Sequence, residues 1–386
     1  MKYLLIALLL ISCRDLQQEL CGGVDSQCYE QSPSTSSVVP TDSTTTTSAD
    51  AKAATYLALS YDASSDMRDS YGFIQPKQGT TYLDQGDAMM WNSVSLATMC
   101  MLGHSQMNTL WTAMKTHMFV DGRPRRHPLK DSSGTSISKD MVTGLLYVGA
   151  MAKYQSCNLD GYLTVLEDMV TYGKANDWEF QNPANLGDKK ESTTLMTDSI
   201  KRMMVSVLRS YGSSTSISLD RPDIDVLPAS MKSSDYILEK KFYCRQGIVG
   251  ACIKGANMGA FGAHLFFLQV VTHYMEYKIT GSSTYYSKDD LDTMLYDAGR
   301  LGDSIDQNNW LTVAAYRHFT GGTHNDISTF LNAFPDVLPG EIEGTNATSR
   351  GCTDFMWQRV GWEHCGGSGE VYTGNDFLQA YAWGKI

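Results

Sequence analysis

The chain has 386 residues, of which 42% are hydrophobic and 19% are charged, and its formal net charge is −11. The length suits one large globular domain or two fused ones. The acidic balance argues against nucleic acid and an anionic bilayer surface as main partners, because both are bound by basic faces. Neither the cysteines nor the eight histidines show a metal-binding spacing, so we expect no metal and no cofactor.

The chain begins with "MKYLLIALLLISC", a lysine followed by a short apolar run. A permanent membrane span needs about 20 apolar residues, so residues 1–12 are predicted to be a signal peptide. The segment ending in Cys13 resembles the lipobox of bacterial lipoproteins, which implies that Cys13 is acylated, for example with palmitate. Several acyl chains hold a protein on a bilayer durably. We therefore expect a protein of the bacterial cell envelope, lipid-anchored through Cys13 to a membrane on its periplasmic or extracellular face.

Residues 13–53 are predicted to be a flexible spacer. Their stretch "SPSTSSVVPTDSTTTTSAD" is rich in Ser, Thr and Pro and has few large apolar residues, so it cannot bury a core. No second spacer follows, and residues 54–386 are predicted to form a single domain.

Eight cysteines follow Cys13, and an even number in an exported protein suggests disulfides. Three pairs are close in sequence, which leaves Cys100 with Cys157. The alternative is that Cys100, within an apolar helix, is a buried thiol. The three close pairs are 21 with 28, 244 with 252, and 352 with 365.

Helical periodicity dominates the predicted domain. Apolar residues recur at spacings of three and four along 141–152, 159–169 and 196–211, as they do on one face of a helix. Further helices are predicted at about 88–102, 105–119, 258–279, 288–303, 307–320, 325–333 and 375–383.

Four predicted helices end in glycine, which supplies the left-handed residue that closes a helix: Gly173, Gly212, Gly281 and Gly321. Their spacing gives a weak period near 40 residues, typical of stacked helical hairpins. Many helices joined by loops of unequal length favour a closed ring of hairpins. The long loops 120–137, 174–192 and 213–232 are expected to frame a cleft.

The segment "DQGDAMMW" places Asp87 directly before a predicted helix, with Trp91 one turn further on. Asp87 is either a catalytic carboxylate or the N-cap of that helix. Trp91 is either a platform on which a sugar ring stacks or a core residue.

The segment "GRPRRHP" at 122–128 concentrates positive charge in an acidic chain and leads to a helix whose first turn contains Asp140. Arg125 and Arg126 suit a carboxylate ligand, and His127 can exchange a proton near neutral pH. Alternatively, the arginines pair with nearby aspartates and fasten the loop.

Near the C-terminus, aromatic and charged residues gather between Cys352 and Asp376 in a glycine-rich stretch. We expect Trp357, Arg359 and Asp376 to bind substrate there. The alternative is a terminal segment that closes the ring with buried tryptophans.

These segments also carry a resemblance. From about Thr81 to Ile386, the motifs "GDAMMW", "SKDMVTGLL" and "TGNDFLQAYAWG" together resemble the α/α toroid superfamily of glycoside hydrolases and polysaccharide lyases. The resemblance implies an all-α ring of helical hairpins with long rim loops, and a polysaccharide or oligosaccharide as substrate. Because a fold hosts several functions, it implies fold more strongly than activity.

Two mechanisms are compatible with this interpretation. A hydrolase needs two carboxylates that flank the glycosidic bond, and Asp87 and Asp140 are the candidates. A lyase needs a cation to neutralise a uronate, here Arg125 or Arg126, and a base, here His127 or a tyrosine. We favour the hydrolase slightly; a non-catalytic lipoprotein that binds a glycan or an envelope protein through the same cleft is the third alternative.

Overall fold

The computed structural model describes residues 49–83, 85–129, 137–181, 193–196, 198–219, 259–298, 310–321, 370–371 and 373–386. These residues belong to one compact unit, Thr46–Ile386. They are predominantly helical, with a few short strands, so the all-α prediction is confirmed. Predicted features beyond these residues, including Cys13, Trp357, Arg359, the helix at 325–333 and the three close cysteine pairs, lie outside the described residues.

The helices are α2 (Ala49–Ser60), α3 (Ala88–Leu102), α4 (Met107–His117), α5 (Lys139–Tyr154), α6 (Tyr162–Ala175), α7 (Asp198–Ser210), α11 (Gly259–Thr280), α12 (Lys288–Ala298), α13 (Trp310–Thr320) and α15 (Asn375–Lys385), with a 3-10 turn, η1, at Gln85–Asp87. The strands are β1 (Lys77–Gln78), β2 (Thr81–Tyr82), β3 (Phe119–Val120), β4 (Arg123–Pro124), β5 (Glu179–Gln181), β6 (Thr193–Leu195) and β7 (Glu370–Val371). The strands form small antiparallel pairings, β2-β1-β7, β3-β4 and β5-β6.

Each predicted helix that falls on described residues is present in the structure, although the end of one of them differs. The predicted bounds match those of α3 to the residue and those of α4, α5, α7 and α11 to within a few residues. Glycine ends three helices as predicted, because Gly212, Gly281 and Gly321 each adopt a positive φ.

The prediction that Gly173 ends a helix is wrong, since α6 continues to Ala175. The reason for this glycine is close packing: a Cβ at Gly173 would lie 2.7 Å from the Trp178 ring. Trp178 turns back onto α6 with a positive φ of 62°, and only a residue without a side chain leaves room for its indole.

The predicted boundary between spacer and domain also shifts. Helix α2 begins at Ala49, five residues inside the predicted spacer, and Lys52 and Ala53 are buried. At its two ends α2 contacts the C-terminal segment. The Asp50 carboxylate accepts a hydrogen bond from Tyr381 of α15, and Ser60 donates one to the carbonyl of Thr373, two residues before α15 begins. The sequence at 49–53 is alanine-rich and helix-forming, and tertiary contacts with the C-terminal helix order it.

Two kinds of helix build the unit. Helices α3 and α5 are buried nearly along their whole length, as expected of helices that pack on every side. Helices α4 and α6 each bury a single stripe of residues and expose the opposite face. The contacts of the more buried helices close a cycle among the described residues, because α3 contacts α5, α5 contacts α7, α7 contacts α11, α11 contacts α13, α13 contacts α15, and α15 contacts α3.

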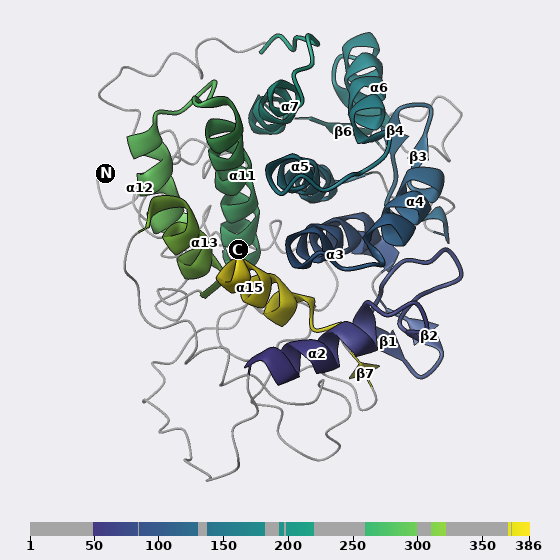
Figure 1. The fold of residues 1–386 in the computed structure, drawn as a ribbon. Helices are drawn as coiled ribbons and strands as arrows, with labels where there is room; N and C mark the ends of the chain where they lie inside the picture. Colours follow the sequence, from purple (N-terminus) through teal and green to yellow (C-terminus); the bar gives the residue numbers. More distant parts are fainter. Residues whose placement is uncertain are drawn as a thin grey trace, which may run out of the picture. The chain divides into compact units, whose positions relative to one another are not determined.

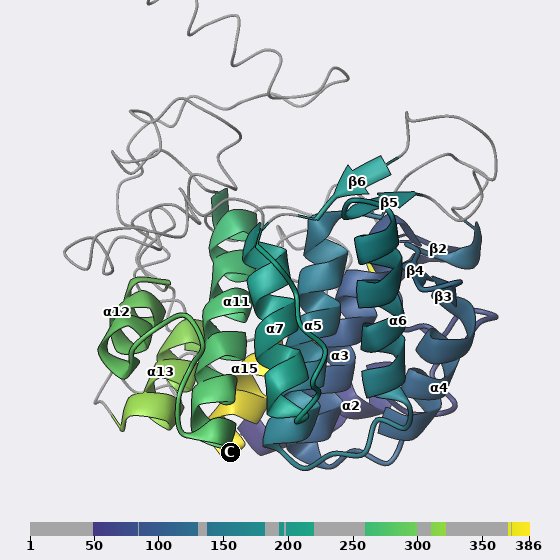
Figure 2. The same cartoon turned by 90° about the horizontal axis from the view of Figure 1, so that it is seen from above.

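Figures 1 and 2 show this arrangement from two directions; in Figure 2, α11, α7, α5 and α3 run side by side. Helix α5 also packs directly against α11, across the cycle. The interior of the cycle is therefore filled by side chains where α5 meets α11.

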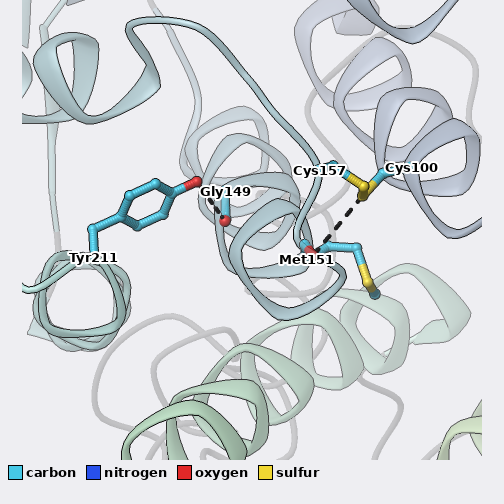
Figure 3. The surroundings of a disulfide bond; sticks show 5 residues. All are labelled: Cys100, Gly149, Met151, Cys157 and Tyr211. Atoms are coloured by element: carbon cyan, nitrogen blue, oxygen red, sulfur yellow. Dashed lines mark hydrogen bonds between the residues drawn. A yellow bond between two sulfur atoms is a disulfide. The ribbon is translucent and has the colours of Figure 1, made fainter. Parts of the chain in front are cut away.

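One predicted disulfide lies among the described residues and is confirmed. Cys100, near the end of α3, bonds to Cys157, just after α5, with the two Cα atoms 5.9 Å apart. Figure 3 shows the bond beside the Met151 carbonyl, while on another side of α5 the Tyr211 hydroxyl donates to the Gly149 carbonyl. A bridge across a separation of 57 residues is expected to stabilise the fold by about 4 kcal/mol, because it restricts the unfolded chain.

The buried His264 on α11 is expected to make the fold acid-sensitive. Burial lowers the pKa of His264 to about 3. Because an unfolded histidine titrates near pH 6.5, the unfolded state binds a proton that the native state excludes between about pH 6.5 and pH 3. The free energy of unfolding is therefore unaffected by the protonation of His264 above about pH 6.5. Below about pH 6.5 it falls by up to about 1.4 kcal/mol per pH unit because of this one histidine.

Glutamine does not titrate, so we expect His264→Gln to take up about one proton fewer on unfolding than the unsubstituted protein. Its free energy of unfolding, measured by urea titration between about pH 7 and pH 4, should therefore fall less steeply as pH falls. Val271→Ala, a substitution on the same helix at a fully buried residue about two turns from His264, is the control and should weaken the fold without changing that pH dependence. Equal slopes for His264→Gln and the unsubstituted protein would contradict this account.

Candidate functional site

The candidate site is built around the loop that joins α4 to α5. Strands β3 and β4 form a tight hairpin, with Asp121 and Gly122 at its tip in positive-φ conformations. A Cβ at Gly122 would lie 2.7 Å from the Asp168 carbonyl oxygen of α6. Glycine is required at this position both for its backbone conformation and because the tip lies directly against α6.

Two arginines of the "GRPRRHP" segment fasten this loop. Arg123 is buried, lies over the Tyr172 ring at 5.7 Å and has a guanidinium nitrogen 3.6 Å from the Asp121 carboxylate. Arg125 donates from Nε to the His117 carbonyl at 2.6 Å, at the end of α4. Both side chains therefore hold the loop to neighbouring helices. The alternative interpretation expected arginine–aspartate pairs, and Arg123 forms one with Asp121, whereas Arg125 donates to a backbone carbonyl.

His127 is also held inside the protein. Its ring is fully buried, its Nε2 lies 2.8 Å from the Asp69 carboxylate, and its Nδ1 accepts the Leu129 N–H at 3.1 Å. Because Nδ1 accepts, the proton is on Nε2, which donates to Asp69. With both nitrogens engaged, the ring offers none to a substrate, and its geometry suits a structural role.

Arg126 is the member of this segment that reaches another predicted site residue. Its Nη1 donates to the Gly86 carbonyl at 2.7 Å and to the Asp87 carboxylate at 3.1 Å. Asp87 occupies the N-cap position of α3, but its side chain makes no capping hydrogen bond. The carboxylate is instead directed toward Arg126, and 40% of its side-chain surface is exposed.

Asp140 lies in the first turn of α5, as predicted. Among the described residues it has no hydrogen-bond or ion-pair partner. Ser138 occupies the N-cap position without making a side-chain cap, so the start of α5, like that of α3, leaves its side chains uncommitted to capping.

Helices α3 and α5 run parallel, which brings Asp87 and Asp140 to the same end. A Cβ at Gly144 would lie 3.3 Å from the Cα of Met90, in the first halves of the two helices. Near their other ends, Cys100 Sγ lies 3.9 Å from the Met151 carbonyl oxygen. Asp87 is three residues before Met90 and Asp140 four before Gly144, so each lies about 5 Å along its helix from the close contact. Their side chains are then on the order of 10 Å apart.

The remaining predicted site residues are not part of this arrangement. Trp91 is 4% exposed, which makes it a core residue and leaves no face for a sugar ring. Asp376 is the second residue of α15, and the structure does not describe its side chain. Trp357 and Arg359 lie outside the described residues.

A buried polar cluster between α7 and α11 was not predicted. Glu276 is fully buried, and its carboxylate accepts hydrogen bonds from Ser206, Arg209 and Thr284. Ser206 Oγ also lies 2.8 Å from His273 Nδ1, and burial lowers the pKa of His273. The signal was available in the sequence, because a His and a Glu three residues apart interrupt the apolar run "LFFLQVVTHYMEY" and must find partners when that helix is buried.

A second charged group at the start of α7 was also missed. Asp198 is 8% exposed, with Oδ1 3.4 Å from Lys201 Nζ, and its Oδ2 has no hydrogen-bond partner among the described residues. Lys201 lies over the Trp178 ring at 5.2 Å. Charges in "DSIKRMM" look solvent-exposed in the sequence, and only the packing of α7 shows that they are buried.

No group of three or more His, Cys, Asp or Glu side chains that could hold a metal ion occurs within the described ranges. In the same ranges, no helix is long and apolar enough to cross a membrane. Comparison with protein-family models, with curated proteins and with solved structures found no match to this chain.

The close contact between α3 and α5 predicts a sensitive position. Gly144→Ala would place a methyl group 2.6 Å from the Met90 Sδ and 3.2 Å from the Met90 carbonyl oxygen. We expect it to lower the free energy of unfolding by about 1–3 kcal/mol, because backbone atoms have to move. Gly86→Ala, where a Cβ meets nothing within 4 Å, is the matched control for urea unfolding. Equal stability of the two variants would show that α3 and α5 are not in tight contact.

Proposed function

We propose that the chain is a carbohydrate-active enzyme of the α/α toroid type that hydrolyses a glycosidic bond in a polysaccharide. The observation that carries the proposal is the parallel contact of α3 and α5, which brings Asp87 and Asp140 to one end of the unit. The closed cycle of helix contacts supports the toroid, because a ring of hairpins requires each inner helix to touch the next.

The proposed reaction assigns one task to each carboxylate. Asp140, as the acid, donates its proton to the glycosidic oxygen while the bond to the anomeric carbon breaks. Asp87, as the base, takes a proton from a water whose oxygen attacks that carbon from the opposite face. Asp87 is assigned to the base because its hydrogen bond from Arg126 suits a deprotonated carboxylate and orients it.

The estimated separation is compatible with this assignment. An inverting hydrolase needs its two carboxyl groups roughly 6.5–9.5 Å apart, to leave room for the water, whereas a retaining enzyme needs about 5 Å. Two side chains on adjacent parallel helices, on the order of 10 Å apart, are closer to the wider spacing than to the narrower one.

The lyase alternative has less support from the geometry. Of its candidates, His127 is buried with both ring nitrogens hydrogen-bonded, and Arg125 donates to a backbone carbonyl. Arg126 remains as a cation beside the proposed cleft. A binding protein without activity would use the same cleft, and the assay below separates the three alternatives.

The assay mixes the purified protein with neutral and acidic polysaccharides and follows new reducing ends together with the ultraviolet absorbance of unsaturated products. We expect reducing ends without absorbance. Asp87→Asn and Asp140→Asn should each lower turnover by about 100-fold or more, because each removes a proton-transfer group. Asp160→Asn changes an exposed carboxylate that pairs with Lys115 and is the matched control, with unchanged turnover.

Two results would overturn the hydrolase. Absorbance that rises together with reducing ends means elimination and directs attention to Arg126. Retention of a polysaccharide without any product, unchanged in both aspartate variants, means a binding protein.

We further propose that the protein is lipid-anchored at Cys13 in the bacterial cell envelope. The support is the lipobox resemblance together with the Cys100–Cys157 disulfide, which suits an oxidising compartment. Labelled palmitate should be incorporated into the protein in a bacterial host, and Cys13→Ala should abolish the label and release the protein from membranes. Labelling that persists in Cys13→Ala would contradict the anchor.

A further inference from the structure

We propose that Asp69 is a positioning residue of the candidate site, which acts through His127 to fix Arg126 and thereby the Asp87 carboxylate. This inference rests on the proposed function, in which Asp87 activates water. Neither the resemblance nor the motifs of the sequence single out Asp69.

Asp69 is held by four hydrogen bonds. Its Oδ1 accepts the backbone N–H groups of Tyr71 at 2.8 Å and Phe73 at 3.0 Å. Its Oδ2 accepts from Gln75 Nε2 at 2.6 Å and from His127 Nε2 at 2.8 Å. The side chain is 4% exposed, so this carboxylate is fixed in place and charge-assisted bonds at both oxygens replace its solvation.

The His127 ring is fixed as firmly. Besides its two hydrogen bonds, it meets the rings of Tyr71 and Phe73 edge-on, each at 5.3 Å between centroids. On the other side of Arg126, the backbone N–H of Arg125 donates to the Met118 carbonyl at 2.9 Å. The backbone is therefore fixed both before and after Arg126, which determines where its guanidinium can reach.

The segment that contains Asp69 is itself tied to α3. Asn92 of α3 is fully buried; its Oδ1 accepts the Ile74 N–H at 2.8 Å, and its Nδ2 donates to the Ile74 carbonyl at 3.0 Å. The contacts thus form a closed circuit that starts on α3 at Asn92, passes through Asp69, His127 and Arg126, and returns to Asp87 at the start of α3. A closed circuit leaves the carboxylate little freedom, which is the precision that positioning for catalysis requires.

The substitution Asp69→Asn breaks the link to His127. Asparagine keeps an oxygen for the Tyr71 and Phe73 N–H groups, but its NH₂ group cannot accept from His127 Nε2 or from Gln75 Nε2. The Gln75 hydrogen bond is therefore lost as well, and the two His127 variants isolate the link. His127→Ala removes the same link from the other side, and His127→Gln restores an N–H donor toward Asp69. Glu276→Gln is the matched control, because it weakens another buried carboxylate with several hydrogen bonds, between α7 and α11.

The experiment uses the full chain and two measurements: hydrogen–deuterium exchange of the peptide covering 85–91, and kcat and KM on a polysaccharide that the protein cleaves. We expect Asp69→Asn and His127→Ala to speed exchange at 85–91 by about tenfold. We also expect them to lower kcat by about 10–100-fold, with little change in KM. His127→Gln should recover most of both losses, and Glu276→Gln should lower the unfolding midpoint while leaving both measurements unchanged.

The positioning role is overturned if Asp69→Asn, like Glu276→Gln, leaves the rate of hydrogen–deuterium exchange at residues 85–91 unchanged. If Asp69→Asn does not fold, the comparison of His127→Ala with His127→Gln decides in the same way. Faster exchange at 85–91 in a protein that cleaves no polysaccharide supports the circuit and overturns only the hydrolase. Cleavage that Asp69→Asn leaves unchanged supports the hydrolase and overturns the positioning role.

Discussion

The close parallel packing of α3 on α5 is the constraint on which the rest of the site depends. Gly144 has no side chain, so the backbone of Met90 can approach it, and the Cys100–Cys157 disulfide joins the same two helices near their other ends. Two helices joined at both ends cannot slide past each other. The residues that open them, Asp87 and Asp140, are consequently held at one end, whatever the loops around them do.

The basic segment between α4 and α5 shows how one charged loop divides its tasks. Arg123, Arg125 and His127 are used inside the protein, against α6, the end of α4 and Asp69 respectively. Arg126 contacts the start of α3 instead. Most of the segment fastens the loop, and the Arg126–Asp87 ion pair is also an arginine–aspartate contact. A catalytic role for Arg126 stays a prediction.

Much of the fold could be predicted because helices carry a local signal. Apolar residues at spacings of three and four predicted α5, α6 and α7, and glycines in left-handed conformations marked three helix ends. The errors came from tertiary contacts. Gly173 is required by the approach of Trp178, which has no local signal, and residues 49–53, although alanine-rich, are ordered by contacts with α15.

The site could be predicted only in part, for the same reason. Positions at helix starts follow from the sequence, so Asp87 and Asp140 were found. Burial does not follow, and Trp91 and His127 have side chains that suit a binding site but lie in the interior. Asp69, which is 58 residues from its partner His127, gives no local sign of that contact.

The most direct test of the central claim is a crystal structure of the Asp140→Asn variant with an oligosaccharide from a polysaccharide that the unsubstituted protein binds. The account predicts a glycosidic oxygen beside position 140 and a water between the sugar and Asp87, with the two side chains roughly 6.5–9.5 Å apart. An oligosaccharide bound elsewhere, or side chains at positions 87 and 140 too far apart to reach the same sugar, would contradict it.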